Sequence, residues 1–284
     1  MQRLNLVGCG RVGKTLARLW HLQASLQIQD ILTTSSASAA AAIEFIGAGH
    51  AVSSLADMRP ADLWMIATPD AQIADMAQQL ARAQGSPSPP LVFHASGALG
   101  SDLLAPLSDL GWRTASAHCI LSFATPQVAI TQFAGTACAL EGDPVACTTL
   151  RTAFTAIGAH CFEVASADKL LYHAAAVFAT NFLPVLQSVA EDLWRTTGVP
   201  LALIPDLRAS LLHNAVANIT ALGPQGALTG PAARGDVAAI ARQGAAVSAW
   251  SVDAGRAYAA LSALALQRAA DRATPPQQAL PGKG

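Results

Sequence analysis

The chain has 284 residues, of which 52% are hydrophobic and 12% are charged, and its formal net charge is -1. This composition supplies enough apolar surface for a large core and excludes a disordered body. The length predicts two domains, and the lack of a basic excess argues against nucleic acid as a partner.

Five scattered cysteines form no C-x-x-C pair, which fits buried thiols of a reducing compartment better than disulfides or a metal site. Residues 170–190 are apolar and long enough to span a membrane, but His173, Asn181 and Pro184 interrupt them, which favours a buried helix. We therefore expect a cytoplasmic protein with no signal peptide, no membrane association and no bound metal.

The first half of the chain alternates strand-like and helix-like stretches. Strands are predicted at 4–9, 28–34, 51–54, 62–68, 90–96, 112–118, 135–142 and 160–165. Helices are predicted at 12–23, from 35 to about 45, and at 71–83, 101–110 and 144–157. This alternation indicates an α/β fold over residues 1–165, a doubly wound parallel sheet of the Rossmann type with helices on both faces.

The second half contains no further predicted strand. Long helices are predicted over 167–197, 200–221 and 236–269, with a loop at 222–236. The change in pattern predicts a domain boundary near 165 and a helical substrate domain over 166–272. The last residues, 273–284, are polar and rich in proline, so we expect a disordered tail.

The stretch LNLVGCGRVGKTLARLW, residues 4–20, joins the first strand to the first helix through G-x-G-x-x-G. In such a loop Gly8 permits the turn, Gly10 lets the backbone approach a pyrophosphate, and Gly13 allows close packing of helix on sheet. The alternatives are a turn that holds no ligand and a P-loop, because GCGRVGKT also fits the Walker pattern. The position in the first βαβ unit favours a dinucleotide, whose binding residues are then Gly8, Cys9, Gly10, Arg11, Val12 and Gly13.

Two further loops are expected along the same cofactor. Thr34 and Ser35 follow the second strand, where an acidic residue would bind the ribose of NAD; Asp30 falls too early for that role. Hydroxyl groups can donate to a 2'-phosphate, which favours NADP, although no arginine is present there and NAD stays open. Thr68 and Pro69 close the fourth strand and are expected in the crevice wall, unless they merely begin a helix.

Histidines close two predicted strands. His94, with Ser96 beside it, ends one strand and His118 ends the next. Because the carboxyl ends of parallel strands share one edge of a sheet, we expect both rings to face one crevice.

The predicted helix after residue 167 is apolar nearly all round, so its polar residues need a partner. Lys169, His173 and Thr180 fall along one stripe, with Asn181 beside them, and Pro184 leaves the carbonyl of Thr180 free. We take His173 as the first candidate for proton transfer, with Lys169, Asn181, His94, Ser96 and His118 as orienting or alternative groups. The alternative is a satisfied buried polar network.

Seven motifs together resemble one protein family. In chain order they are VGCGRVG, IATPDAQIADMAQQL, HASGALGSDLLAPL, SAHCILSF, FAGTACALEGD, DKLLYHAAAVFATNFL and ALTGPAARGD. They resemble the bacterial Rossmann-like oxidoreductases whose helical C-terminal domain has no assigned function. That family is similar to deazaflavin-dependent NADP reductases, pyrroline-5-carboxylate reductase and prephenate dehydrogenase. Cys119 departs from the family, which has proline after this histidine, and the basic residue expected after the second strand is absent.

The resemblance implies an NADP-binding Rossmann domain, a helical domain of the 6-phosphogluconate dehydrogenase C-terminal type, and a homodimer formed through that domain. Residues and resemblance together predict an NADP-dependent oxidoreductase. It would transfer a hydride to or from a small polar carbonyl, imine or hydroxy acid in the cleft between the domains. The alternative is a dinucleotide-binding sensor or scaffold without turnover.

Overall fold

The structure is a computed structural model that describes residues 1–83 and 90–273. The chain divides into two compact units, Met1–Phe182 and Leu183–Gly284, which we call the α/β unit and the helical unit. The last strand ends at Glu163, close to the predicted boundary, and the first compact unit continues past it to Phe182. The predicted disordered tail, except residue 273, lies outside the described residues.

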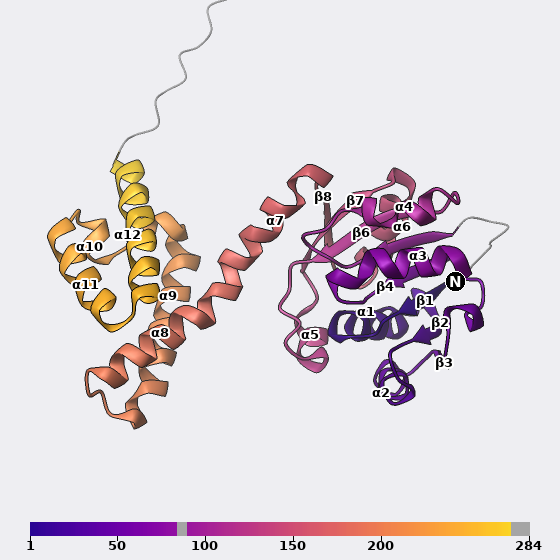
Figure 1. Ribbon diagram of the computed structural model, residues 1–284, viewed down its shortest axis with the longest axis horizontal. Coiled ribbons are helices and arrows are strands. Elements are labelled where there is room, and N and C mark those ends of the chain that lie inside the picture. The colour runs from indigo at the N-terminus through magenta and orange to yellow at the C-terminus, as the bar shows by residue number, and fades with distance from the viewer. Residues whose placement is uncertain (84–89, 274–284) are drawn as a thin grey trace, which may run out of the picture. The chain divides into compact units, whose positions relative to one another are not determined.

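The α/β unit is built on an eight-stranded sheet (Figure 1). Its strands are β1 (Gln2–Val7), β2 (Leu26–Leu32), β3 (His50–Val52), β4 (Leu63–Ile66), β5 (Leu91–His94), β6 (Arg113–Cys119), β7 (Ala137–Gly142) and β8 (His160–Glu163). They lie in the order β3-β2-β1-β4-β5-β6-β7-β8. All eight predicted strands are present, and the Rossmann-type fold class is confirmed.

One pair of strands departs from the predicted parallel sheet, because β7 runs antiparallel to β6. The connection between them contains a short helix, α5 (Pro126–Gln132), that the sequence pattern did not reveal. Thr125 caps this helix by accepting a hydrogen bond from the backbone N–H of Val128. After this connection the chain returns along β6, so that Cys119 pairs with Cys138 and Ala115 with Gly142.

Helices cover both faces of the sheet, as predicted. They are α1 (Arg11–Leu22), α2 (Ser36–Ile46), α3 (Ile73–Ala83), α4 (Ala105–Ser108) and α6 (Pro144–Thr155). The strands are buried on both sides, since Leu63 and Met65 join one hydrophobic cluster while Trp64 and Ile66 join the other. Alternate side chains of a strand point to opposite faces, so both layers of helices are held by the same strands.

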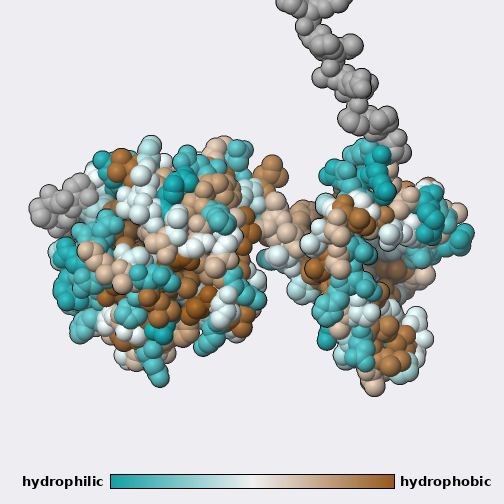
Figure 2. Space-filling model, turned by 180° about the vertical axis from the view of Figure 1, so that it is seen from behind, coloured by the Kyte–Doolittle hydropathy of each residue, from teal (hydrophilic) through white to brown (hydrophobic). Residues whose placement is uncertain are grey.

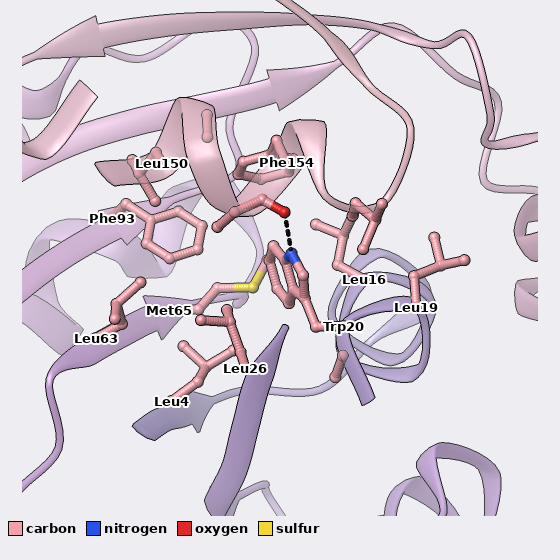
Figure 3. Packing of buried hydrophobic residues seen from close by; sticks show 14 of the residues in the cluster. Leu4, Leu16, Leu19, Trp20, Leu26, Leu63, Met65, Phe93, Leu150 and Phe154 are labelled. Carbon is pink, nitrogen blue, oxygen red and sulfur yellow. Dashed lines mark hydrogen bonds between the residues drawn. The ribbon is translucent and has the colours of Figure 1, made fainter. Parts of the chain in front are cut away.

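Trp20 lies at the centre of the larger cluster (Figure 3). Its side chain is fully buried, and its indole N–H donates to the backbone carbonyl of Ala153 at 2.9 Å. The rings of Phe93 and Phe154 meet it edge to face, with centroid separations of 6.4 and 5.2 Å. This packing fixes α1 on the sheet and therefore holds the glycine loop that precedes it.

The predicted helix 167–197 is present but is not uniform. It consists of α7 (Lys169–Ala176), a π-helical segment (Val177–Asn181) and α8 (Phe182–Thr196). The π-helical segment lies just before Pro184, which has no N–H to donate to the carbonyl of Thr180. A wider turn at this position accommodates the lost hydrogen bond, and such turns occur frequently at functional sites.

The prediction that residues 170–190 form a buried helix is wrong for the single chain. The helical stretch Ser166–Thr196 is long and apolar enough to cross a membrane, and none of its most apolar window is buried. Leu170, Leu171 and Phe178 are 70%, 77% and 65% exposed. Apolar side chains lie on all faces of this helix, and one packed face cannot cover them all.

The helical unit continues with α9 (Ile204–Gly226), α10 (Gly230–Ala233), α11 (Val237–Trp250) and α12 (Val252–Ala273) (Figure 1). The single helix predicted over 236–269 is wrong, because Ser251 is extended and its hydroxyl accepts from the N–H of Ala254 at the start of α12. The predicted loop 222–236 is partly helical, since α9 continues through a kink at Gly223.

Candidate functional site

The candidate site lies at the edge of the sheet where β1, β4, β5 and β6 end. These strands are mutually parallel neighbours, so the loops that follow them share one edge. The strand order reverses between β1 and β4, because β1 has β2 on its other side. Ligands of open α/β sheets bind in the crevice at such a reversal.

The loop after β1 contains three glycines, and glycine is needed at each position for a different physical reason. Gly8 has φ +80°, and a Cβ there would lie 2.8 Å from the carbonyl oxygen of Ala67. A Cβ on Gly13 would lie 3.2 Å from the Cβ of Ala67, which reflects close packing of α1 on the sheet. Gly10 has an ordinary φ of -73°, and a Cβ there would meet nothing within 4 Å. Packing within the chain therefore does not explain Gly10, whereas a backbone that a phosphate must approach does.

The start of α1 is open to an anion. Gly10 caps the helix without a side-chain hydrogen bond, and the first turn contains no acidic residue. The guanidinium group of Arg11 is exposed and has no ion pair or hydrogen bond among the described residues. Val12 packs against the core, and burial raises the pKa of the Cys9 thiol to about 12, so this cysteine stays neutral. The loop thus presents backbone N–H groups and one free cation.

The turn after β2 carries no available carboxylate. Asp30 is buried within the strand and is paired with the guanidinium of Arg59, which donates to both of its oxygens. Ser35 caps α2 by accepting from the N–H of Ser38 at 3.1 Å, and Thr34 is exposed. The hydroxyl of Ser35 therefore already has a structural role as a helix cap, and a cofactor ribose would have to bind it in addition to the N–H of Ser38.

Thr68 and Pro69 lie in the loop after β4, directly opposite Gly8. A Cβ on Gly8 would come within 3.0 Å of the Cγ2 of Thr68. The hydroxyl oxygen of Thr68 is buried but has no hydrogen-bond partner among the described residues. An orphaned buried hydroxyl costs free energy unless a bound molecule pairs with it. Pro69 is exposed and begins a short 3-10 turn, as a plain helix start would.

A pocket of about 510 Å³ joins the glycine loop to the polar residues of the later segments. It is contained within the α/β unit. The residues that give it polar or aromatic character are Arg11, His118, Ser122, Phe123, His173, Thr180 and Asn181. Four of these seven, Arg11, His118, His173 and Asn181, are site residues predicted from the sequence, and Thr180 lies on the predicted stripe with His173.

His118 and His173 meet above Gly97. Their ring centroids are 5.3 Å apart and their planes are tilted by 75°. A Cβ on Gly97 would overlap both the Nδ1 of His173 and the Nε2 of His118, so these two nitrogens converge on one small volume. The Nδ1 of His173 is buried and has no partner among the described residues. Glycine at position 97 is therefore required for the two imidazoles to approach.

His118 is neutral at physiological pH. Burial, with smaller contributions from the nearby His173 and Lys169, lowers its pKa to about 4, and Asp70 acts in the opposite direction. Its Nδ1 lies 2.9 Å from the hydroxyl oxygen of Tyr172. A neutral imidazole carries one proton and one lone pair, so it can donate one hydrogen bond and accept another.

His94 does not face this pocket. Its Nε2 donates to the carbonyl of Gly100 at 2.9 Å, and its Nδ1 accepts from the N–H of Ser96 at 3.2 Å. Burial lowers the pKa of His94, which is consistent with a neutral ring. The hydroxyl of Ser96 donates to Asp70 at 2.7 Å. Both residues are thus satisfied within the chain and shape the loop after β5.

Lys169 is 2% exposed and belongs to a second, buried network. Its ammonium group donates to the carbonyl of Ser96 at 3.2 Å and to the hydroxyl of Ser116 at 2.7 Å. Ser116 in turn donates to Glu141 at 2.8 Å. Burial would raise the pKa of Glu141, but hydrogen bonds from Ser166 and two other serines hold it below its usual value. Through Ser116, which bridges the two charged groups, this network anchors the start of α7 to the sheet.

Thr180 and Asn181 enter the pocket through the π-helical segment. The hydroxyl of Thr180 lies 3.0 Å from the carbonyl of Ala176 and 2.9 Å from the Oδ1 of Asn181. Because a hydroxyl has one proton, it donates to one of these two oxygens. The amide group of Asn181 remains available as a donor toward the pocket.

Sequence reasoning missed four contributors to this region. They are Tyr172, which contacts His118; Gly97, which makes room for the imidazoles; and Asp70 and Glu141, which hold the surrounding serines. Two of them could have been found from the sequence, because they are adjacent to predicted site residues: Tyr172 directly precedes His173, and Gly97 directly follows Ser96. Asp70 and Glu141 act through residues that are distant in sequence and become visible only in the fold.

The comparisons with known proteins agree with this architecture. Residues 2–118 match the family model of a Rossmann-like domain, and residues 136–265 match that of a domain of unknown function, DUF2520. No curated protein sequence matches the chain. The molecule is thus a Rossmann-fold protein with a helical C-terminal region. More specifically, it belongs to the Rossmann-like proteins that carry a DUF2520 domain, as the resemblance predicted.

Solved structures resemble this chain over nearly its whole length. Protein TM1727 from Thermotoga maritima is 24% identical and has a TM-score of 0.74, with 95% of this chain and 100% of that chain covered. BF3122 from Bacteroides fragilis, a proposed NADP oxidoreductase, is 19% identical with a TM-score of 0.72, covering 94% and 98%. Pyrroline carboxylate reductase from Plasmodium falciparum, solved with NADP bound, is 12% identical with a TM-score of 0.58, covering 95% and 100%. At these identities the likeness establishes the fold.

Proposed function

We propose that the protein is an NADP-dependent oxidoreductase that transfers a hydride to or from a small polar carbonyl, imine or hydroxy acid. The observation that carries this proposal is that one pocket is lined both by Arg11, from the dinucleotide-type loop, and by the pair His118 and His173. A phosphate-binding loop and proton-carrying groups in one cavity are the parts that hydride transfer to a polar double bond requires.

The residues present fit a nicotinamide dinucleotide. The open approach at Gly10, the N–H groups at the start of α1 and the unpaired hydroxyl of Thr68 would hold it. Once bound, this cofactor supplies or accepts the hydride. NADP is favoured over NAD because Asp30 is already paired with Arg59 and the turn that follows β2, at Thr33–Ser36, contains hydroxyl groups and no carboxylate. The two related structures with NADP or NAD+ bound, a pyrroline carboxylate reductase and an imine reductase, support a cofactor of this class.

His173 is the residue we propose for proton transfer. Its Nδ1 is buried, lines the pocket and has no partner among the described residues, so it is free to exchange a proton with a substrate. His118, which is neutral, and the amide of Asn181 orient the reacting group. The remaining candidates have a structural role, since their polar atoms are paired with other parts of the chain; they are His94, Ser96 and Lys169.

We also propose that the protein is a homodimer formed through the helical region. Large apolar side chains are exposed there, including Phe178, Val185, Leu201, Leu222 and Val252 at 65%, 58%, 70%, 62% and 63%. Figure 2 shows apolar residues at the surface of the helical unit. Exposed apolar area of this extent is typical of a surface that another chain covers, and a second copy is the simplest occupant. Light scattering coupled to size exclusion should give twice the monomer mass.

Two glycine variants test cofactor binding. Gly10→Ala should leave the free energy of unfolding unchanged, because the added methyl group meets open space, yet weaken NADPH binding about tenfold or more by blocking the phosphate. Gly8→Ala should lose both binding and stability, since its φ is positive and its Cβ would strike a backbone carbonyl. Binding is measured by the change in NADPH fluorescence. Unchanged affinity in a folded Gly10→Ala protein would contradict the proposed cofactor site.

Turnover is tested with oxo acids, imines and hydroxy acids by following NADPH absorbance for wild type and His173→Ala. We expect activity with at least one of these classes and a loss of about a hundredfold or more in His173→Ala. Full activity in His173→Ala would exclude His173 as the proton carrier. Tight NADPH binding without any turnover would favour the alternative function, a dinucleotide sensor.

A further inference from the structure

Three side chains form a polar chain that ends in the pocket. The hydroxyl oxygen of Tyr172 lies 2.9 Å from the Nδ1 of His118, whose ring it meets edge to face at 5.6 Å. On the far side of the same ring, the Nε2 of His118 and the Nδ1 of His173 converge above Gly97. The state of the first hydrogen bond therefore decides which atom His118 offers to the pocket.

The 2.9 Å contact fits two arrangements, donation by the hydroxyl of Tyr172 to the Nδ1 of His118 or the reverse, and the tautomer of His118 decides between them. We assign the first, in which the Nδ1 of His118 accepts the proton of the Tyr172 hydroxyl, a group with no other partner among the residues that the structure describes. Burial raises the pKa of Tyr172, which keeps the phenol protonated. An imidazole that accepts at Nδ1 and is neutral must carry its proton at Nε2. In this assignment His118 presents an N–H donor toward the pocket.

His173 presents the complementary atom. Its Nδ1 converges with the N–H of His118, and two N–H groups directed at one small volume would repel each other. The favourable arrangement has the lone pair of His173 at Nδ1, and this atom has no partner among the described residues. The two rings together offer one donor and one acceptor a short distance apart.

We propose that the pocket selects a hydroxyl group and the corresponding carbonyl over an amine and the corresponding imine, and that Tyr172 is the positioning residue that sets this preference. A hydroxyl accepts from His118 while it donates to His173, and a carbonyl oxygen accepts from His118. A protonated amine or imine has only N–H donors, one of which would face the N–H of His118. This inference rests on the proposed function. Of its three substrate classes it keeps carbonyls and hydroxy acids and removes imines.

The corresponding reaction balances in both directions. In the oxidation, the hydroxyl proton passes to the Nδ1 of His173, and the hydrogen on the same carbon leaves as a hydride to an oxidised nicotinamide dinucleotide, while the carbon–oxygen double bond forms. In the reduction, the hydride and the proton return by the same routes. Tyr172 takes part in neither transfer, because its hydroxyl stays bonded to the opposite nitrogen of His118.

The tautomer of His118 provides a test that needs no cofactor. In the full-length protein with isotope-labelled histidine, NMR should show His118 protonated at Nε2 in the wild type. Tyr172→Phe keeps the ring and removes the donor, so it should give a mixture of tautomers. Phe162→Leu is the matched control, because Phe162 packs against the ring of Tyr172 at 6.1 Å but leaves its hydroxyl in place. A wild-type ring protonated at Nδ1 would overturn the proposal.

Ligand preference is tested with a pair of probes of similar shape, cyclohexanol and cyclohexylammonium. Titration of each, followed at the ring signals of His118 and His173, should show the alcohol binding about tenfold more tightly in wild type and Phe162→Leu. Tyr172→Phe should lose most of this preference. Equal or tighter binding of the ammonium probe, or no binding of the alcohol, would overturn the inference. Failure of the proposed function is seen separately, as absence of NADPH binding to the same samples.

Discussion

The two compact units bury their apolar side chains to very different degrees. The α/β unit has two hydrophobic clusters, one on each face of its sheet, and many of their members are completely buried. Among the described residues of the helical unit, the buried ones are Ile204, which is 2% exposed, and Gly255. Both units are rich in alanine, leucine and valine, so composition alone does not separate them.

This contrast shows that a sheet and a set of helices bury the same types of apolar residue to different extents. A central sheet exposes two faces, and helices of the same unit can cover both. The helices α9, α11 and α12 have no such layer between them, and side chains such as Leu222, at 62% exposure, point outward. The α/β unit can therefore supply its own stability, whereas the helical unit is expected to need a second chain.

The largest test of this contrast is a pair of tryptophan substitutions. Trp20→Ala should lower the free energy of unfolding by about 3–5 kcal/mol, because it removes a fully buried ring and its hydrogen bond to Ala153. Trp250→Ala, at a site 38% exposed in the helical unit, should cost less than about 1 kcal/mol in the monomer. Urea unfolding followed by circular dichroism measures both. Similar costs at both positions would break the comparison.

The second test compares how the stability of each unit depends on protein concentration. If a second copy covers the helical unit, a hundredfold dilution through the dissociation range should lower its stability by about 2.7 kcal/mol. Hydrogen exchange should accelerate in α12 and stay constant in β4. Exchange in α12 that does not depend on protein concentration would show that the helical unit is stable without a partner.

Acid should destabilise the α/β unit through His118. The pKa of this residue is lowered to about 4 in the folded protein, against about 6.5 when unfolded, so the unfolded chain binds more protons between these values. The stabilising effect is complete above pH 6.5 and is lost as the pH falls toward 4, which amounts to about 2 kcal/mol between pH 7 and pH 5. His118→Gln should flatten this dependence in urea unfolding.

The helical unit supplies the control for that experiment. His213→Gln replaces an exposed histidine and should keep the wild-type dependence on pH. A His118→Gln protein that still loses stability to the same extent between pH 7 and pH 5 would assign the effect to other groups, of which the buried His94 is the first candidate.

Removing a helix cap should give the smallest loss in the free energy of unfolding, and the loss should be similar in the two units. Asp143 accepts from the N–H groups of Val145 and Ala146 at the start of α6, and Asp236 accepts from Ala239 at the start of α11. Replacing either aspartate by alanine should cost about 1 kcal/mol, since a cap satisfies local backbone donors whether or not a core lies nearby. A thermal unfolding comparison in which Asp236→Ala costs nothing would show that α11 depends on packing alone.

Much of the α/β unit could be predicted because its signals are local. Alternating apolar stretches located all eight strands, and the glycine loop was placed correctly between β1 and α1. The antiparallel direction of β7 could not be predicted, since pairing depends on a partner strand and not on the strand itself. The break at Ser251 was missed for a related reason, as an apolar pattern continued through it on both sides.

The candidate site shows the same division between local and distant causes. By itself the sequence determined which residues stand at strand ends: the glycines of the phosphate loop, His94, His118 and, on the following helix, His173. Only the tertiary structure decided that His94 is satisfied by Gly100 while His118 meets Tyr172 and His173. A strand end follows from residues next to one another in the chain, whereas the partner of an imidazole nitrogen is supplied by whichever distant segment the fold brings within hydrogen-bond distance.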